Sequence, residues 1–221
     1  CLQTQRSRFK ADLGRFDAEF PLTWQIGFAT TGKPVFDQAA IDDWPEVPEG
    51  TRYGDLLEED AGALLPGEDW EVYHPPEDGH EYTVGVDTAS WTATRDYACI
   101  GIWDRTMERQ AAEYYARVTP DVLAVQACRA GRWYQCRGVD ALLVIEIENH
   151  GGATLAKVME LGFKSVYCRK MGKAVQPGAN WLDIWGWSTN RETRPLMVTA
   201  VEESIRNRVH FWYSRRLARE C

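Results

Sequence analysis

The sequence predicts an α/β fold in which helices flank a mixed central sheet. Residues 81–87 (EYTVGVD) alternate apolar and polar side chains, which is typical of a strand with one buried face. Residues 141–147 (ALLVIEI) are almost continuously apolar, as in a strand buried on both faces. Between these segments, apolar residues recur at helical spacing from 122 to 133, after a proline at the expected helix start. Strand, helix and strand in this order favour an α/β sandwich.

The remaining elements follow the same patterns along the chain. Two further strands are expected directly after the first, at 97–103 (YACIGIW) and 110–118 (QAAEYYARV), so that three strands form a meander. After the apolar run we expect a helix from Gly151 to Met159, a short strand at 165–168, a loop at 169–190, a helix at 191–207 and an extended segment at 209–213.

Charge is distributed unevenly over the 221 residues, whose formal net charge is −8. Residues 37–81 contain 15 acidic side chains and one basic residue, together with several prolines and glycines. We interpret 37–80 as an acidic linker or surface excursion that would repel a polyanion. Basic residues gather in two later clusters, where nucleic acid would be attracted, although a solvated helix face explains them equally well: Lys164, Arg169, Lys170 and Lys173, and then Arg206, Arg208, Arg215, Arg216 and Arg219.

The sequence predicts neither a membrane or signal segment nor a working nucleotide-binding loop. No apolar run approaches the roughly 18 residues that a membrane-spanning helix needs, and the first residues contain no apolar signal core. Residues 27–33 (GFATTGK) match the phosphate-binding loop of nucleotide hydrolases, but Pro34 stands where a hydroxyl must bind Mg²⁺. The chain is therefore not expected to hydrolyse ATP.

Carboxylates at strand ends carry the best signal for a functional site. Asp87 ends the first strand, and Glu146 lies near the end of the apolar strand. Hard oxygen ligands on neighbouring strands form a natural cradle for a divalent metal ion. Asp96, after the first turn, and Glu148, on the same strand face as Glu146, are auxiliary candidates. Spacing alone leaves the alternative open that these acids pair with arginines or cap turns.

Several motifs in collinear order resemble the large terminase subunits of tailed phages. Residues 16–37 (FDAEFPLTWQIGFATTGKPVFD) resemble the segment that links the ATPase and nuclease parts of that family. Residues 82–89 (YTVGVDTA) with 95–104 (RDYACIGIWD) are similar to its first nuclease strand and hairpin, and 119–124 (TPDVLA) with 133–152 (WYQCRGVDALLVIEIENHGG) to its helix and second acidic strand. Residues 186–198 (GWSTNRETRPLMV) are similar to the following loop and helix.

This resemblance implies a ribonuclease H-like nuclease domain at 81–221 without its final helix. Residues 1–36 would be an interdomain segment after an absent ATPase domain. The family's first acid corresponds to Asp87, and its second, in the pattern E-x-x-N-x-G, to Glu146 with Asn149 and Gly151. Two Mg²⁺ or Mn²⁺ ions would bind there and support phosphodiester hydrolysis. The family's third acid lies beyond Cys221, so this chain is expected to be a weak or inactive nuclease unless Asp96, Glu148 or Asp183 substitutes.

The same resemblance implies partners and a location. The complete enzyme would cut concatemeric double-stranded DNA and contact the portal protein and the small terminase subunit in the host cell cytoplasm, with no membrane. From the basic clusters we expect DNA contacts chiefly at Lys170, Lys173, Arg215 and Arg216. The alternative is a non-catalytic DNA- or portal-contacting module with a degenerate or truncated nuclease fold.

Overall fold

A six-stranded mixed sheet forms the centre of the protein. The computed structural model describes residues 36–56, 64–89, 96–148, 150–169 and 184–220. The strands, in spatial order β1-β2-β5-β4-β3-β6, are antiparallel neighbours except for the parallel pair β3–β6. Their bounds are β1 Arg52–Leu56, β2 Leu64–Val72, β3 Tyr82–Asp87, β4 Ala98–Asp104, β5 Arg109–Ala116 and β6 Leu142–Ile145.

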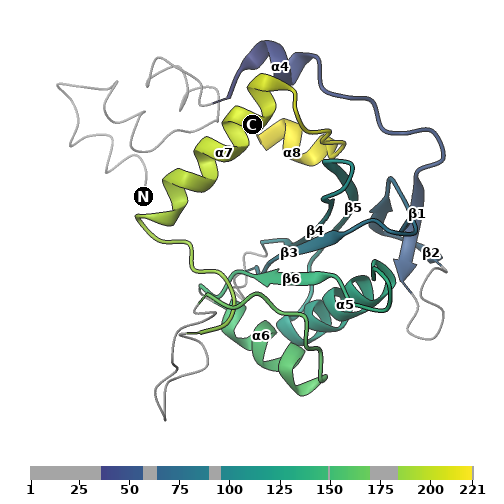
Figure 1. Cartoon of the computed structure of the whole chain (residues 1–221), viewed down its shortest axis with the longest axis vertical. Coiled ribbons are helices and arrows are strands. Elements are labelled where there is room, and N and C mark those ends of the chain that lie inside the picture. Colours follow the sequence, from purple (N-terminus) through teal and green to yellow (C-terminus); the bar gives the residue numbers. More distant parts are fainter. Residues whose placement is uncertain (1–35, 57–63, 90–95, 149, 170–183, 221) are drawn as a thin grey trace, which may run out of the picture.

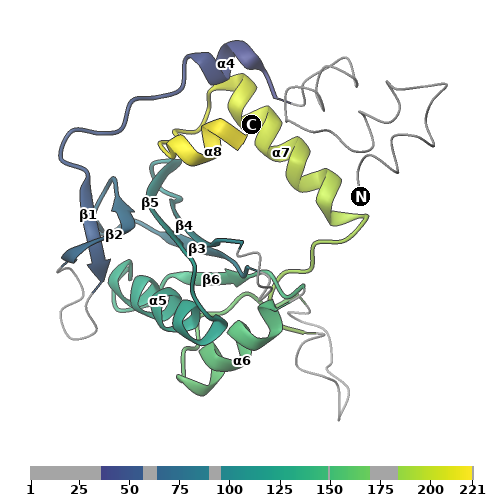
Figure 2. The same cartoon turned by 180° about the vertical axis from the view of Figure 1, so that it is seen from behind.

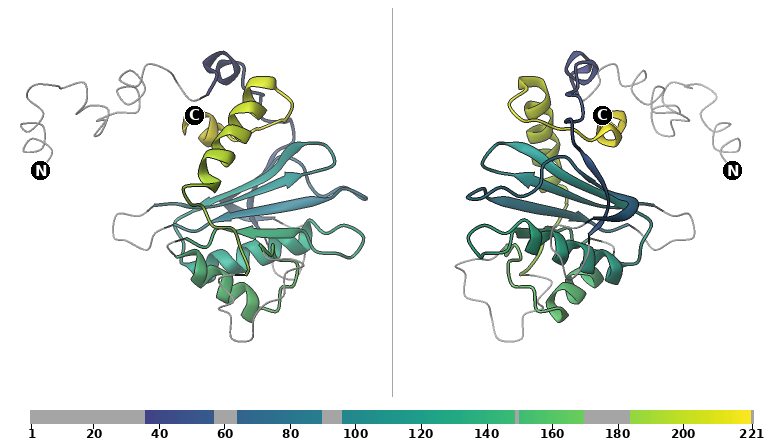
Figure 3. Two further views of the ribbon diagram at one scale, coloured as in Figure 1. Left: turned by 60° about the vertical axis from the view of Figure 1, so that its left-hand side comes forward. Right: turned by 90° about the vertical axis from the view of Figure 1, so that its right-hand side faces the viewer.

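Helices lie on both sides of this sheet (Figures 1 and 3). Helices α5 (Pro120–Trp133) and α6 (Gly151–Glu160) cover one face. On the other side lie α7 (Thr193–Asn207), α8 (Arg215–Glu220) and the short α4 (Gln38–Asp42). Figure 2 shows α4 beside α7, and a small apolar cluster of Ala40, Trp44 and Ile205 joins the two helices.

The main core fills the space between the sheet and helices α5 and α6. Alternate residues of the central strands point into it, and its largest fully buried side chains include Trp70, Tyr114 and Tyr134. The opposite sheet face is less buried, because β3 and β4 place glycine, aspartate and cysteine there. Core packing therefore stabilises one face and leaves part of the other open.

Most predicted elements are present, and the predicted α/β fold, a mixed central sheet flanked by helices, is confirmed. The apolar run at 141–147 is an exception in one respect, because β6 is not buried on both faces: Leu142 and Val144 are only half-buried. The strands expected at 165–168 and 209–213 are isolated bridges, at Val166, Cys168 and Phe211. Among the residues that the structure describes, no helix is long and apolar enough to cross a membrane.

The interpretation of residues 37–80 as a linker or surface excursion is corrected by the structure. Strands β1 and β2 extend the sheet, with Trp70 opposite Tyr114 and Val72 opposite Ala112 on β5. Trp70 and Val72 are completely buried or nearly so. The acidic composition concealed this strand pair, because one apolar face is enough to hold a strand in a sheet whatever the charge of its other residues. The expected interdomain segment 1–36 lies almost wholly outside the described residues.

Candidate metal centre

Parallel pairing of β3 and β6 brings Asp87 and Glu146 together. Val86 and Ile145 are register partners, and the Glu146 amide donates to the Val86 carbonyl at 3.0 Å. Asp87 ends β3, and Glu146 is the residue directly after β6. Because parallel strands end at the same edge of the sheet, the two acids are neighbours there, as the sequence predicts.

The two carboxyl groups perturb each other. The pKa of Asp87 is raised to about 6, first because surrounding protein atoms partly desolvate it, and then because of the negative charge of Glu146 and a hydrogen bond with that side chain. The Asp87 side chain nevertheless keeps solvent contact. Two carboxylates this close together cannot both ionise without cost unless a cation lies between them. The pair therefore has the charge and the hard oxygen atoms that suit a divalent metal ion.

A pocket of about 340 Å³ opens above this pair. Gly85 of β3 and Gly101 of β4 are register partners at its floor, and a Cβ added at Gly101 would meet no atom within 4 Å. Neither glycine has a positive φ, so the backbone does not require glycine there. Glycine inside a strand often marks close approach of a ligand or another backbone. The other lining residues are Val86, Asp87, Cys99, Val144, Glu146, Trp187, Thr189 and Met197.

Contacts behind the acids fix their position. Thr88, the residue after Asp87, forms a buried 3.0 Å hydrogen bond with Thr154 of α6. A Cβ added at Gly151 would lie 1.7 Å from the Glu146 carbonyl oxygen. Only glycine therefore lets the start of α6 pack this closely, which gives the glycine of the E-x-x-N-x-G pattern a steric role. Asn149 lies outside the described residues.

The segment after the long loop closes one side of the pocket. Trp187 pairs with the chain next to Glu146, since its amide donates to the Ile145 carbonyl at 2.7 Å and its carbonyl accepts from the Ile147 amide at 2.8 Å. The Trp187 indole donates to the Met197 sulfur of α7 at 3.1 Å. Residues of the 186–198 segment, one of the motifs that carry the resemblance, thus line one side of the pocket.

The auxiliary acids do not join the pair. Glu148 is exposed and accepts a 2.6 Å hydrogen bond from Ser188, outside the pocket lining. Asp96 is also exposed and does not line the pocket. Asp183 lies outside the described residues. Among the residues that the structure describes, the pocket is thus lined by two carboxylates.

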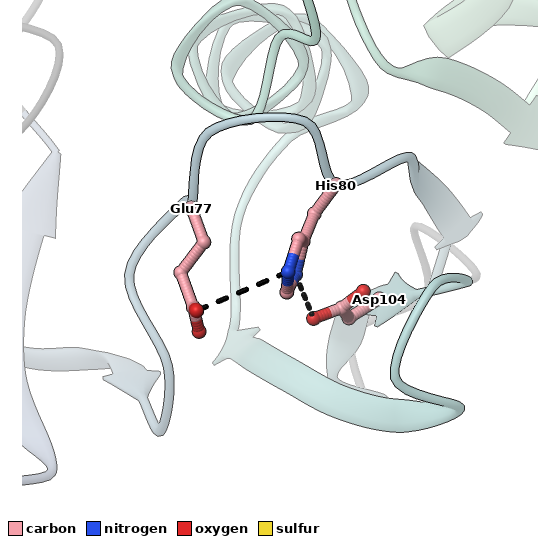
Figure 4. Close-up of side chains that lie close together, drawn as sticks. All are labelled: Glu77, His80 and Asp104. Carbon is pink, nitrogen blue, oxygen red and sulfur yellow. Dashed lines mark hydrogen bonds and ion pairs between the residues drawn. The ribbon is translucent and has the colours of Figure 1, made fainter.

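A second acidic group lies elsewhere, at Glu77, His80 and Asp104 (Figure 4). The His80 Nδ1 atom lies 3.0 Å from the completely buried Asp104 carboxylate. Arg109 already contacts both acids, with its Nε 3.3 Å from Asp104 and its Nη2 bonded to Glu77. The Asp104 carboxylate also accepts from two amides of the β4–β5 turn. An arginine thus provides the cation here, and the group holds a turn together.

The predicted DNA contacts have different surroundings. Lys170 and Lys173 lie outside the described residues, and Arg215 is exposed at the start of α8. Arg216 instead makes two salt bridges of 2.9 Å, to Glu71 and Glu113, which tie α8 to β2 and β5. Its side chain therefore has a structural role that sequence reasoning missed. Both acids lie more than 100 residues earlier in the chain, so no local sequence pattern indicates the pair.

Comparison with known proteins supports the fold. No protein-family model matches the chain, and no curated protein is significantly similar in sequence. Solved structures of the large terminase nuclease from thermophilic phage G20c are similar in fold, each at 12% identity. The form with bound magnesium has a TM-score of 0.55 over 83% of this chain and 75% of its own, and the form with bound zinc 0.56 over 84% and 85%. The form with bound cobalt has 0.54 over 81% and 73%. The chain thus has a terminase nuclease-like, ribonuclease H-like fold.

Proposed function

We propose that the chain is the metal-dependent endonuclease part of a phage DNA-packaging terminase, acting on double-stranded DNA. One observation carries the proposal: Asp87 and Glu146 lie together in an open pocket, close enough for Glu146 to raise the pKa of Asp87, in a fold whose solved structural neighbours hold divalent metal ions. The collinear motifs of the sequence support the same conclusion. They also support a role in cutting concatemeric DNA in the host cell cytoplasm, alongside a portal protein and a small terminase subunit.

The acid pair would hold Mg²⁺ or Mn²⁺. Such ions, when bound, would activate a water for attack on a DNA phosphate and stabilise the leaving oxygen. Asp87 and Glu146 would supply the anionic oxygens, and the Thr88–Thr154 bond and Gly151 would hold the two strand ends in place. The glycine floor leaves room for the DNA backbone above the acids.

The number of carboxylates limits the expected activity. Two metal ions need enough anionic ligands to hold both, and Mg²⁺ gives up its water reluctantly. With two lining carboxylates among the described residues, one ion would bind well and the second weakly. We therefore expect slow cutting in Mg²⁺ and better cutting in Mn²⁺, because Mn²⁺ has a somewhat higher affinity for such sites. This low ligand count also favours the second candidate, a non-catalytic DNA- or portal-contacting module.

Metal binding and plasmid nicking test the proposal together. Mn²⁺ affinity is measured by calorimetry, and nicking of supercoiled plasmid is measured in Mg²⁺ and in Mn²⁺. Glu146→Gln should abolish both, because it removes one of the two acids. Glu148→Gln is the matched control, since that exposed acid two residues away lies outside the pocket, and it should change neither.

The outcomes separate the candidates. Mn²⁺ binding and nicking that both survive Glu146→Gln would refute the assigned site. Mn²⁺ binding without nicking under any condition would favour the non-catalytic module. Loss of nicking on Glu148→Gln but not on Glu146→Gln would reverse the assignment of the second acid.

A further inference from the structure

Four side chains form a continuous column on the open sheet face, near the acid pair. The order of contact is Arg117, Tyr97, Tyr115 and Arg216. Arg117 lies over the Tyr97 ring at 4.3 Å from its centroid, and Arg216 over the Tyr115 ring at 4.9 Å. The two tyrosine rings are stacked, with centroids 4.3 Å apart and planes 8° from parallel.

The inner end of this column is anchored, and the outer end is open. Arg216 is bound to Glu71 and Glu113, as described above. Arg117 is exposed, and within the described part of the chain no carboxylate is paired with it. Tyr97 is 39% exposed beside it. The unpaired cation is thus the outermost member of the column.

The contact with Tyr97 orients the Arg117 guanidinium so that its N–H donors can bind an anion. A guanidinium that lies over an aromatic ring keeps its N–H donors in its own plane, directed away from the ring. Contact with the Tyr97–Tyr115 stack restricts the arginine, so less conformational entropy is lost when the donors meet an anion. Planar paired donors of this kind match the oxygens of a phosphate.

Strand register places the column at the same edge of the sheet as the acids. Asp87 is opposite Cys99, and Cys99 is opposite Tyr115, so two strand spacings separate Asp87 from Tyr115. At about 4.8 Å per spacing this is about 10 Å from Asp87 to Tyr115, and Arg117 lies a further two residues, about 7 Å, along the chain from Tyr115. Arg117 follows on the same face as Tyr115, by the two-residue period of a strand.

We propose that Arg117, oriented by Tyr97, binds a backbone phosphate of the DNA duplex near the phosphate at the acid pair but distinct from it. This inference rests on the proposed function, because it takes the acid pair as the point where the DNA is cut. The contact would fix the register of the duplex on the sheet and read no base sequence. Arg117 is accordingly a positioning residue.

Salt-dependent DNA binding tests the proposal. Affinity of the full chain for a labelled 30-base-pair duplex is measured by fluorescence anisotropy in EDTA over a salt series. Arg117→Ala should weaken binding about tenfold and reduce the log–log salt slope by about 0.9, as expected for one lost phosphate contact. Arg117→Lys should keep the slope and lose part of the affinity, because the charge remains but the planar donors are gone. Tyr97→Leu should weaken binding, whereas Tyr97→Phe should not, since the ring and not the hydroxyl orients the arginine.

A matched arginine on the opposite edge of the sheet controls for general loss of charge. Arg105 is exposed and pairs with Glu81 at the far end of β4, so Arg105→Ala should leave affinity and slope unchanged. Mn²⁺ binding, measured by calorimetry, should be the same in every variant, because none of these residues lines the pocket.

Different failures have different meanings. Unchanged affinity and slope after Arg117→Ala would overturn the proposal, as would equal losses on Arg105→Ala. Loss of DNA binding on Arg117→Ala in a protein that binds no Mn²⁺ would support the phosphate contact and refute the nuclease site. A parent chain that binds no duplex at any salt concentration would overturn both proposals.

Discussion

Asp87→Asn tests whether the metal centre carries a stability penalty in the absence of metal. The folded protein raises the pKa of Asp87 from 3.8 to about 6, so it binds the Asp87 proton more tightly than the unfolded chain does. The stabilising effect of this proton is complete below pH 3.8 and is lost as the pH rises through about 6. Above that range, the ionised Asp87 destabilises the metal-free protein. The amide of the variant carries no charge and can still donate to Glu146.

The size of the effect follows from the shift. A shift of about two units corresponds to about 3 kcal/mol, and solvent screening of this exposed side chain reduces the expected effect to about 1 kcal/mol. In EDTA at pH 8, Asp87→Asn should therefore be about 1 kcal/mol more stable than the parent. For a chain of this length this is an increase in Tm of about 2–4 °C.

Thermal unfolding at two pH values, with and without metal, measures this. In EDTA the stabilisation should be present at pH 8 and should shrink at pH 4.5, where Asp87 is already mostly protonated. Mn²⁺ at pH 8 should raise the Tm of the parent and not that of the variant. Glu148→Gln, the exposed control, should follow the parent throughout. A variant that is less stable than the parent in EDTA at pH 8, or one whose Tm rises equally with Mn²⁺, would refute the electrostatic explanation.

Three further substitutions probe the rest of the site. Gly101→Ala should add a Cβ at the pocket floor without a clash, so it should stabilise the fold by up to about 1 kcal/mol while nicking falls; unchanged nicking would mean that DNA does not approach the floor. Thr154→Val should leave the buried Thr88 hydroxyl unpaired and lower the free energy of unfolding in urea by about 1–3 kcal/mol; a neutral result would deny that bond its role. Gly151→Ala should cost about 1–3 kcal/mol or more and weaken Mn²⁺ binding by displacing Glu146, and calorimetry showing full affinity would contradict this.

The acid pair could be predicted because strand ends are visible in sequence. Alternation locates the end of β3 at Asp87, and the apolar run locates the end of β6 beside Glu146. Only the parallel pairing of the two strands had to be added, and a helix between them makes that pairing the expected one. Local pattern and topology located candidate acids at one edge of the sheet, and the family resemblance was needed to choose Glu146 over Glu148.

Long-range polar contacts could not be predicted in the same way. The salt bridges of Arg216 with Glu71 and Glu113 join positions more than 100 residues apart. In the sequence, a charged residue in such a salt bridge looks the same as a charged residue exposed to solvent. The sequence also does not indicate the hydrogen bond between Thr88 and Thr154, because threonine is common in strands and helices whether or not its hydroxyl is paired. The acids could therefore be predicted, whereas the residues that fix their position could not.

The two faces of the sheet divide stability from function. The face toward α5 and α6 holds the apolar core, whose burial stabilises the fold. The other face holds two features that reduce stability, paired glycines in adjacent strands and neighbouring carboxylates, together with an exposed arginine on an exposed tyrosine. Because these features share one edge, where β3, β5 and β6 end and β4 begins, a single strand order presents them together to one ligand. Selection for folding alone would remove the glycine pair and the neighbouring carboxylates, so their coincidence with an exposed arginine beside one pocket is better explained by binding of a metal ion and a phosphate backbone than by packing.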